Sequence, residues 1–265
     1  MPSTKRQKEL ARRRAERQAA RRAEERARRR RRRTMLGLTV GGVAVGVLLI
    51  VLAASLFGGD DKKDDPSASA TPSAAAVACG AKAPPAVKKQ TFPKEPALTI
   101  DQKKTYQATA KTSCGTVTWT MDAAKAPHTV NSFAFLAGKK YYDGTFCHRM
   151  TNSSGLVVLQ CGDPEGTGGG GPGYTIAEEN LKGATYKRGT VAMAKTSAPH
   201  STGSQFFLVI KDSQLPPEYT VVGQMDAASL TVMDKILAIG IADGASDGAP
   251  ASKVYIESFA VAPVG

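Results

Sequence analysis

An uninterrupted apolar segment near the N-terminus constrains this chain most, because it separates parts that face different solvents. Residues 35–57 (MLGLTVGGVAVGVLLIVLAASLF) contain no charged side chain. As an α-helix this segment would be about 34 Å long at about 1.5 Å per residue, and the hydrocarbon core of a bilayer is about 30 Å thick. The apolar core of a cleaved secretory signal is shorter, usually about 7–15 residues. We therefore predict a single transmembrane helix over residues 35–57, which contacts membrane lipid.

The basic charge of the chain lies in front of this segment. Residues 1–33 contain 16 Lys and Arg against 4 acidic side chains, whereas the other 232 residues carry 20 basic and 19 acidic ones. The positive-inside rule then predicts that residues 1–34 form a cytoplasmic tail and that the chain beyond residue 57 lies outside the cytoplasm. A nucleic-acid-binding fold carries its basic surface on the folded domain itself, so no nucleic-acid partner is expected. We favour a tail that sets the membrane topology and is otherwise solvated. The less favoured alternative is that the tail binds anionic lipid or RNA.

The chain beyond the apolar segment changes composition once more. Residues 58–96 are rich in Pro, Ala and Ser, which predicts an extracytoplasmic linker whose last part, from Cys79, runs along the domain surface. Residues 97–265 carry the patterns of a folded domain. Helical patterns occur at 126–138 and 230–238, and runs typical of strands occur at 105–111, 115–122, 145–150, 156–160, 189–194, 205–210, 219–224 and 254–260. This content predicts a mainly β fold with a closed or nearly closed antiparallel barrel.

Searches for common catalytic signatures find none in this domain. The histidines His128, His148 and His200 have no metal-ligand spacing, and the cysteines form no C-x-x-C pair. Residues 166–171 match G-x-G-x-x-G, but no strand–helix context of a dinucleotide site surrounds them. We therefore expect neither a metal nor a cofactor.

Four motifs then occur in a recognisable order and spacing: YYDGT at 141–145, CHR at 147–149, VLQCGD at 158–163 and GSQFF at 203–207. Together they resemble the cyclophilin family of peptidylprolyl cis-trans isomerases over about residues 97–265. The resemblance implies a closed eight-stranded antiparallel barrel capped by two helices, in a membrane-anchored bacterial form. We expect the catalytic domain to be monomeric and its partners to be X-Pro segments of extracytoplasmic polypeptides.

The chemistry of prolyl isomerisation needs no nucleophile. Rotation about an X-Pro bond breaks amide resonance, with a barrier of about 18–20 kcal/mol, and donors that stabilise the twisted amide lower it. A guanidinium suits this role because it is always charged and presents a rigid fork of donors. The resemblance assigns it to Arg149, with Gln160 orienting the guanidinium or the substrate carbonyl. The alternative is that Arg149 pairs with a carboxylate for stability.

The resemblance also implies the substrate-binding residues. It assigns the polar contacts to His148 and Gln205, and places Tyr219 where the family often has His. The apolar lining is expected from Val157, Val158, Ala194, Phe207, Leu215 and Val222.

Three positions depart from the family pattern. The family usually has Phe at the positions of Val157 and Val222, and often Trp where this chain has Gln214. A pocket with fewer aromatic rings should hold proline more loosely. The alternative function is therefore a surface-tethered proline-binding or holdase-like chaperone module with weak turnover.

The four cysteines predict disulfides if the domain lies outside the reducing cytoplasm. We expect Cys79 to pair with Cys114. Cys147 and Cys161 flank a predicted hairpin nearly symmetrically, so they are expected to be cross-strand neighbours, either bridged or free.

Overall fold

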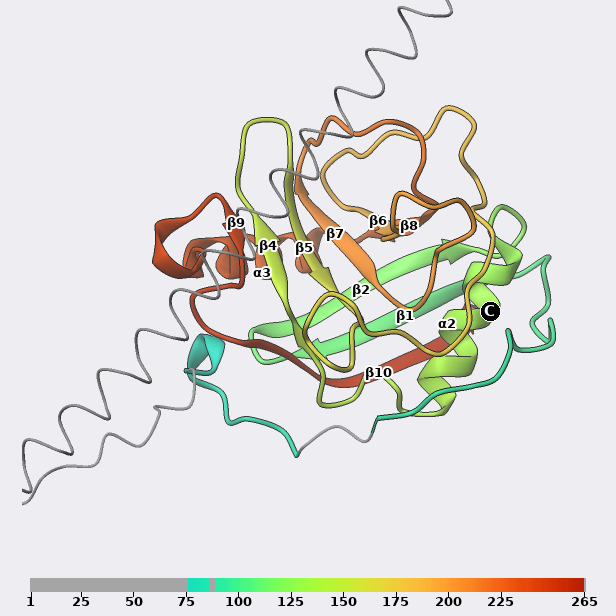
Figure 1. Ribbon diagram of the computed structural model, residues 1–265, viewed down its shortest axis with the longest axis horizontal. Helices are drawn as coiled ribbons and strands as arrows, with labels where there is room; N and C mark the ends of the chain where they lie inside the picture. The colour runs from blue at the N-terminus through green and yellow to red at the C-terminus, as the bar shows by residue number, and fades with distance from the viewer. Residues whose placement is uncertain (1–75, 86–88, 265) are drawn as a thin grey trace, which may run out of the picture. The chain divides into compact units, whose positions relative to one another are not determined.

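The computed structural model describes residues 76–85 and 89–264 (Figure 1). The predicted basic tail, the predicted transmembrane helix and most of the predicted linker lie outside these residues. Within the described part of the chain, no helix combines the length and the apolar character that a membrane crossing requires.

The described residues form one antiparallel sheet of ten strands in the order β3-β10-β1-β2-β8-β6-β7-β5-β4-β9. Figure 1 shows β1, β2 and β10 side by side, with β4, β5 and β7 crossing them steeply. The strands are β1 (Thr105–Thr112), β2 (Gly115–Asp122), β3 (Phe146–Cys147), β4 (Arg149–Thr151), β5 (Val157–Cys161), β6 (Thr190–Met193), β7 (Phe206–Lys211), β8 (Val221–Met225), β9 (Asp247–Gly248) and β10 (Val254–Val264). The mainly β antiparallel prediction is confirmed.

The predicted number of strands and the predicted closure are corrected. The hydrogen-bonded order of the described strands runs from β3 at one end to β9 at the other, rather than around a ring of eight. Two local features raise the count. His148 interrupts the predicted strand 145–150 and divides it into β3 and β4. The two-residue strand β9 forms by pairing with β4, in a segment without strand-like alternation.

The main core lies between the sheet and helix α2 (Pro127–Gly138). Alternation along β2 buries Val117, Trp119 and Met121 on one face, as the sequence pattern predicts. Phe133 of α2 packs against Trp119 with ring centroids 6.2 Å apart. Helix α2 therefore covers the sheet through the apolar face expected from its sequence.

Both helices begin where a carboxylate accepts backbone N–H groups. Glu179 accepts hydrogen bonds from the N–H groups of His128 (3.1 Å) and Thr129 (2.8 Å) at the start of α2. Asp226 accepts one from the N–H of Ser229 (2.7 Å) at the start of helix α3 (Ala227–Ile239). Because Asp226 satisfies an otherwise unpaired donor, α3 begins three residues before the predicted helix 230–238.

The segment before the domain contacts it at several points. The short 3₁₀-helix η1 (Ala78–Gly80) contains Cys79, whose disulfide to Cys114 attaches it to the turn between β1 and β2. Farther along, Phe92 packs edge-on against Phe135 of α2 at 4.9 Å. Residues 76–85 and 89–96 thus pack on the domain.

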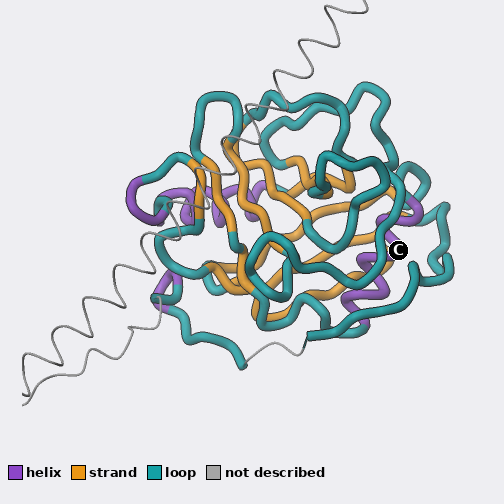
Figure 2. The backbone as a smooth tube through the Cα atoms, viewed as in Figure 1, coloured by secondary structure: helices purple, strands orange, loops and turns teal. Residues whose placement is uncertain are grey.

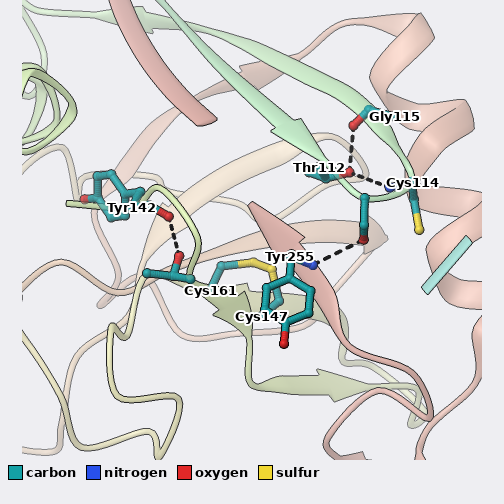
Figure 3. Close-up of a disulfide and its surroundings, with 9 residues drawn as sticks. Thr112, Cys114, Gly115, Tyr142, Cys147, Cys161 and Tyr255 are labelled. Carbon is teal, nitrogen blue, oxygen red and sulfur yellow. Dashed lines mark hydrogen bonds between the residues drawn. A yellow bond between two sulfur atoms is a disulfide. The ribbon is translucent and has the colours of Figure 1, made fainter. Parts of the chain in front are cut away.

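Two disulfides are present, the expected one between Cys79 and Cys114 and one between Cys147 and Cys161. Cys79 and Cys114 have Cα atoms 5.2 Å apart. The second bond joins Cys147 of β3 to Cys161 of β5, with Cα atoms 4.0 Å apart (Figure 3). Of the two states expected for Cys147 and Cys161, the structure has the bridged one.

Candidate functional site

A cavity of about 250 Å³ lies where β4, β5 and β7 meet the loops that follow β6 and β7. It brings together seven of the residues expected at the site: Arg149, Val158, Gln160, Ala194, Phe207, Leu215 and Tyr219. Leu156 and Lys195 complete the lining.

The apolar part of the cavity belongs to a small cluster that is separate from the main core. Alternation along β7 directs Phe206 into the main core and Phe207 into this cluster, together with Val158. Tyr219 packs edge-on against Phe207, with ring centroids 5.7 Å apart. Tyr186 holds Tyr219 in place, since its hydroxyl donates to the carbonyl of Tyr219 (2.9 Å) and accepts from its N–H (3.0 Å).

The guanidinium of Arg149 stands at the polar side of the cavity and has two partners. Its Nε and Nη2 donate to the two carboxylate oxygens of Asp247 at 2.7 and 2.8 Å. Its Nη1 donates to Oε1 of Gln160 at 3.1 Å. Hydrogen bonding within the ion pair raises the pKa of Arg149 and lowers the pKa of Asp247. Arg149 therefore contacts Gln160, as expected, and also a carboxylate, as the alternative supposed.

A relay of two side-chain amides, those of Gln160 and Gln205, connects Arg149 to the glycine-rich loop of residues 166–171. Pairing of β4 with β5 places Arg149 opposite Gln160, and pairing of β5 with β7 places Gln160 opposite Phe207. Nε2 of Gln160 donates to Oε1 of Gln205 at 2.8 Å. Nε2 of Gln205 in turn donates to the carbonyls of Gly168 (3.0 Å) and Gly170 (2.9 Å). The two glutamines thus connect the guanidinium to the loop.

Residues 162–189 connect β5 to β6 as a long loop (Figure 2). The carboxylate of Asp163 organises its first part by accepting N–H groups from Glu165 (2.7 Å), Thr167 (2.9 Å), Gly168 (2.6 Å) and Gly170 (3.2 Å). Burial by itself would raise the pKa of Asp163, but these donors outweigh it and lower the pKa. The glycines are therefore arranged around a carboxylate.

A larger cavity of about 560 Å³ adjoins this loop. Gln160, Ala194 and Lys195 line both cavities, whereas Gln205 lines the larger one. The two cavities are thus neighbours that share part of their lining.

His148 lines neither of these two cavities. The ring of His148 lies beside Gly168. A Cβ atom built on that glycine would lie 3.7 Å from Nε2 of His148. Both ring nitrogens are buried without a hydrogen-bond partner in the described part of the chain. Burial lowers the pKa of His148. The structure thus places His148 beneath the glycine-rich loop, not among the cavity-lining residues.

Val157 and Val222 were expected in the apolar lining, and the structure places both in the main core. A shift in the β5–β7 register between Val157 and Val158 turns Val157 away from the cavity. On β8, alternation buries Val222 in the main core and sets Val221 against the cavity cluster. Of the three departures from the family pattern, Val157 and Val222 therefore do not widen the cavity.

Three residues at the site were missed from the sequence. Leu156 enters the lining because of the same register shift, which periodicity does not reveal. Lys195 follows Ala194 in the loop after β6. Asp247 lies 98 residues from Arg149 along the chain, and no local pattern could have identified it.

Comparison with known proteins identifies the family. The profile of "Cyclophilin type peptidyl-prolyl cis-trans isomerase/CLD" matches residues 107–261. The chain is 46% identical over 191 residues to the "Probable peptidyl-prolyl cis-trans isomerase B" of Mycobacterium leprae, covering 66% of this chain and 64% of that protein. It is 48% identical over 146 residues to the protein of the same name from Mycobacterium tuberculosis, covering 51% of this chain and 47% of that protein. The chain thus spans between about half and two thirds of the length of these relatives.

Solved structures agree with the fold. A cyclophilin-type peptidyl-prolyl cis-trans isomerase of Cryptosporidium parvum superposes with a TM-score of 0.53 at 22% identity, covering 61% of this chain and 99% of that one. The structure of that protein in the presence of the dipeptide Ala-Pro superposes with a TM-score of 0.52 at 24% identity, covering 59% of this chain and 98% of that one. Because the family profile matches more than half of the sequence and the fold agrees, the chain belongs to the family of cyclophilin-type peptidyl-prolyl cis-trans isomerases.

Proposed function

We propose that this protein catalyses cis–trans isomerisation of X-Pro bonds in polypeptides by a non-covalent mechanism. The observation that carries the proposal is the position of Arg149, whose guanidinium lies at one side of a small cavity that Phe207, Val158 and Leu215 line with apolar groups. Such a cavity suits a proline ring, and the guanidinium suits the polar amide beside it. The names of the relatives and the dipeptide Ala-Pro in the neighbouring structure support the same substrate class.

In this mechanism the apolar lining binds the proline ring and Arg149 acts on the amide. When the C–N bond twists, resonance is lost and the nitrogen becomes able to accept a hydrogen bond. A donor directed at this state lowers the barrier more than it stabilises the planar substrate. Gln160, which also lines the cavity, accepts a hydrogen bond from Nη1 of Arg149 and helps to hold the guanidinium in place. The reaction then needs only binding, orientation and hydrogen bonding.

The clients in this proposal are exported proteins. Its support comes from the sequence: a basic segment precedes an uncharged one of 23 residues, an order typical of a single-pass anchor with a cytoplasmic N-terminus. The two disulfides agree with a domain in an oxidising compartment. We propose that residues 35–57 anchor the protein in the cell membrane and that the isomerase domain is extracytoplasmic.

The experiment is a proline-limited refolding assay with the full-length protein in detergent, compared with detergent alone. We expect the slow phase, which takes tens to hundreds of seconds for an uncatalysed X-Pro bond, to accelerate in proportion to catalytic amounts of protein. An unchanged rate, or protection from aggregation that requires stoichiometric protein, would instead favour the holdase-like chaperone. Val157 and Val222 pack in the main core and so do not by themselves support that alternative.

A further inference from the structure

The short strand β9 brings a single carboxylate to the site. The segment between α3 and β10 folds back on itself, since the N–H of Ala242 donates to the carbonyl of Ala249 at 2.9 Å. Its middle pairs with β4, where Thr151 lies opposite Asp247, and Figure 1 shows β9 beside β4. The N–H of Asn152 extends this pairing by donating to the carbonyl of Ser246 at 2.9 Å. Backbone contacts therefore fix the position of Asp247 relative to Arg149.

The contact between the two side chains uses one whole edge of the guanidinium. Nε and Nη2 each donate to one carboxylate oxygen of Asp247, at 2.7 and 2.8 Å. A planar group held at two points cannot rotate about either bond, which gives such pairs their geometric specificity. The opposite side of the guanidinium is left with Nη1, which reaches Gln160 at 3.1 Å. The carboxylate thus leaves Nη1 as the guanidinium nitrogen on the side of Gln160, which lines the cavity.

The chain contains a second pair that serves as a matched comparison. Nη1 and Nη2 of Arg188 donate to the two oxygens of Asp234 on α3 at 2.8 and 2.7 Å. The side-chain exposures are 33% and 56% for this pair, against 38% and 53% for Arg149 and Asp247. Arg188 also donates to the carbonyl of Ile210 and lines neither of the two cavities described above. Two bidentate ion pairs of similar exposure, one through the Nε and Nη2 edge of the arginine and the other through its Nη1 and Nη2, therefore differ in whether the arginine belongs to the site.

We propose that Asp247 is a positioning residue for Arg149 and that it holds the guanidinium in the orientation required for isomerisation. This inference rests on the proposed function. Asp247 lines neither of the two cavities, whereas Arg149 lines the smaller one, so Asp247 acts through the arginine. Losing it leaves a guanidinium that binds substrate but is poorly aligned with the twisted amide. Misalignment of this kind lowers the rate of the chemical step more than it weakens substrate binding.

The test measures kcat and KM for a short X-Pro peptide with the full-length protein in detergent. We expect Asp247→Ala to lower kcat/KM about tenfold, mainly through kcat, whereas Asp234→Ala stays within about twofold of wild type. In the Arg149→Ala background, Asp247→Ala should have no further effect. The isosteric variant Asp247→Asn, which conserves the volume of the side chain but not its charge, should fall between wild type and Asp247→Ala and serves if the alanine variant does not fold.

A spectroscopic measurement separates this inference from the function on which it rests. The Nε–H resonance of Arg149, observed by ¹⁵N NMR, should shift and exchange faster with water in Asp247→Ala, and it should not change in Asp234→Ala. A wild-type protein without isomerase activity but with this response would refute the proposed function and leave the contact intact. An active wild type whose Asp247→Ala variant keeps or exceeds its kcat/KM would overturn the positioning role. A comparable loss in Asp234→Ala would overturn it as well.

Discussion

Arg149 makes the most consequential contacts at the residue scale, because its guanidinium bonds both to Asp247 and to Gln160. A role in catalysis and a role in stability therefore predict different results for its removal. If Arg149 donates to the twisted amide, Arg149→Ala should lower kcat/KM by two to three orders of magnitude, about 2.7–4 kcal/mol. The fold should persist, because exposed ion pairs contribute about 0–1 kcal/mol. Peptide isomerisation measured beside thermal melting separates the two roles, and near-wild-type turnover would exclude the catalytic one.

Val157 supports a second prediction at the residue scale. This residue is 6% exposed and packs in the main core, so a larger ring has no cavity to enter. We expect Val157→Phe to lower the free energy of unfolding by about 1–3 kcal/mol through overpacking, without raising kcat/KM. Leu156→Phe is the matched control, since Leu156 does line the cavity and should change kcat/KM at a smaller cost in stability. Denaturant unfolding and peptide isomerisation measure both variants, and a faster Val157→Phe enzyme would contradict the assigned packing.

At the scale of elements, the Cys79–Cys114 disulfide attaches η1 to the turn between β1 and β2 and closes a loop of 35 residues. In the chain-entropy account such a loop contributes about 4 kcal/mol to stability. The double variant Cys79→Ser/Cys114→Ser should therefore unfold at a lower denaturant concentration while keeping isomerase activity, because neither residue lines the cavity. Thiol counting of the wild type under denaturing, non-reducing conditions should find no free thiol. Four free thiols would contradict both disulfides.

At the scale of the whole molecule, the expected topology makes the domain accessible from outside the cytoplasm. The basic residues 1–33 precede the apolar segment 35–57, and the positive-inside rule places these basic residues in the cytoplasm. Protease added to intact spheroplasts should remove the isomerase domain and spare an N-terminal epitope tag. Lysed spheroplasts, in which the tag is also cleaved, provide the control. Protection of the domain in intact spheroplasts would reverse the orientation.

Local patterns in the sequence determined much of the fold. Strict alternation identified β1 and β2, and an apolar face identified α2, because the spacing of buried side chains in one element depends only on its own geometry. The spacing of the motifs identified the family. Within the site, the resemblance to the family identified Arg149, Gln160 and Phe207, and the regular pairing of β4, β5 and β7 places them side by side.

Tertiary structure alone decided the remaining features. The register shift between Val157 and Val158 exchanged Leu156 for Val157 in the cavity lining, and such a shift depends on the partner strand rather than on the sequence of β5. The division of the predicted strand at His148 follows from pairing with β10 on one side and β5 on the other. Asp247 meets Arg149 across 98 residues, a contact that no periodicity encodes. A sequence pattern records how a segment divides its side chains between faces, and only the folded chain determines which distant segment each face meets.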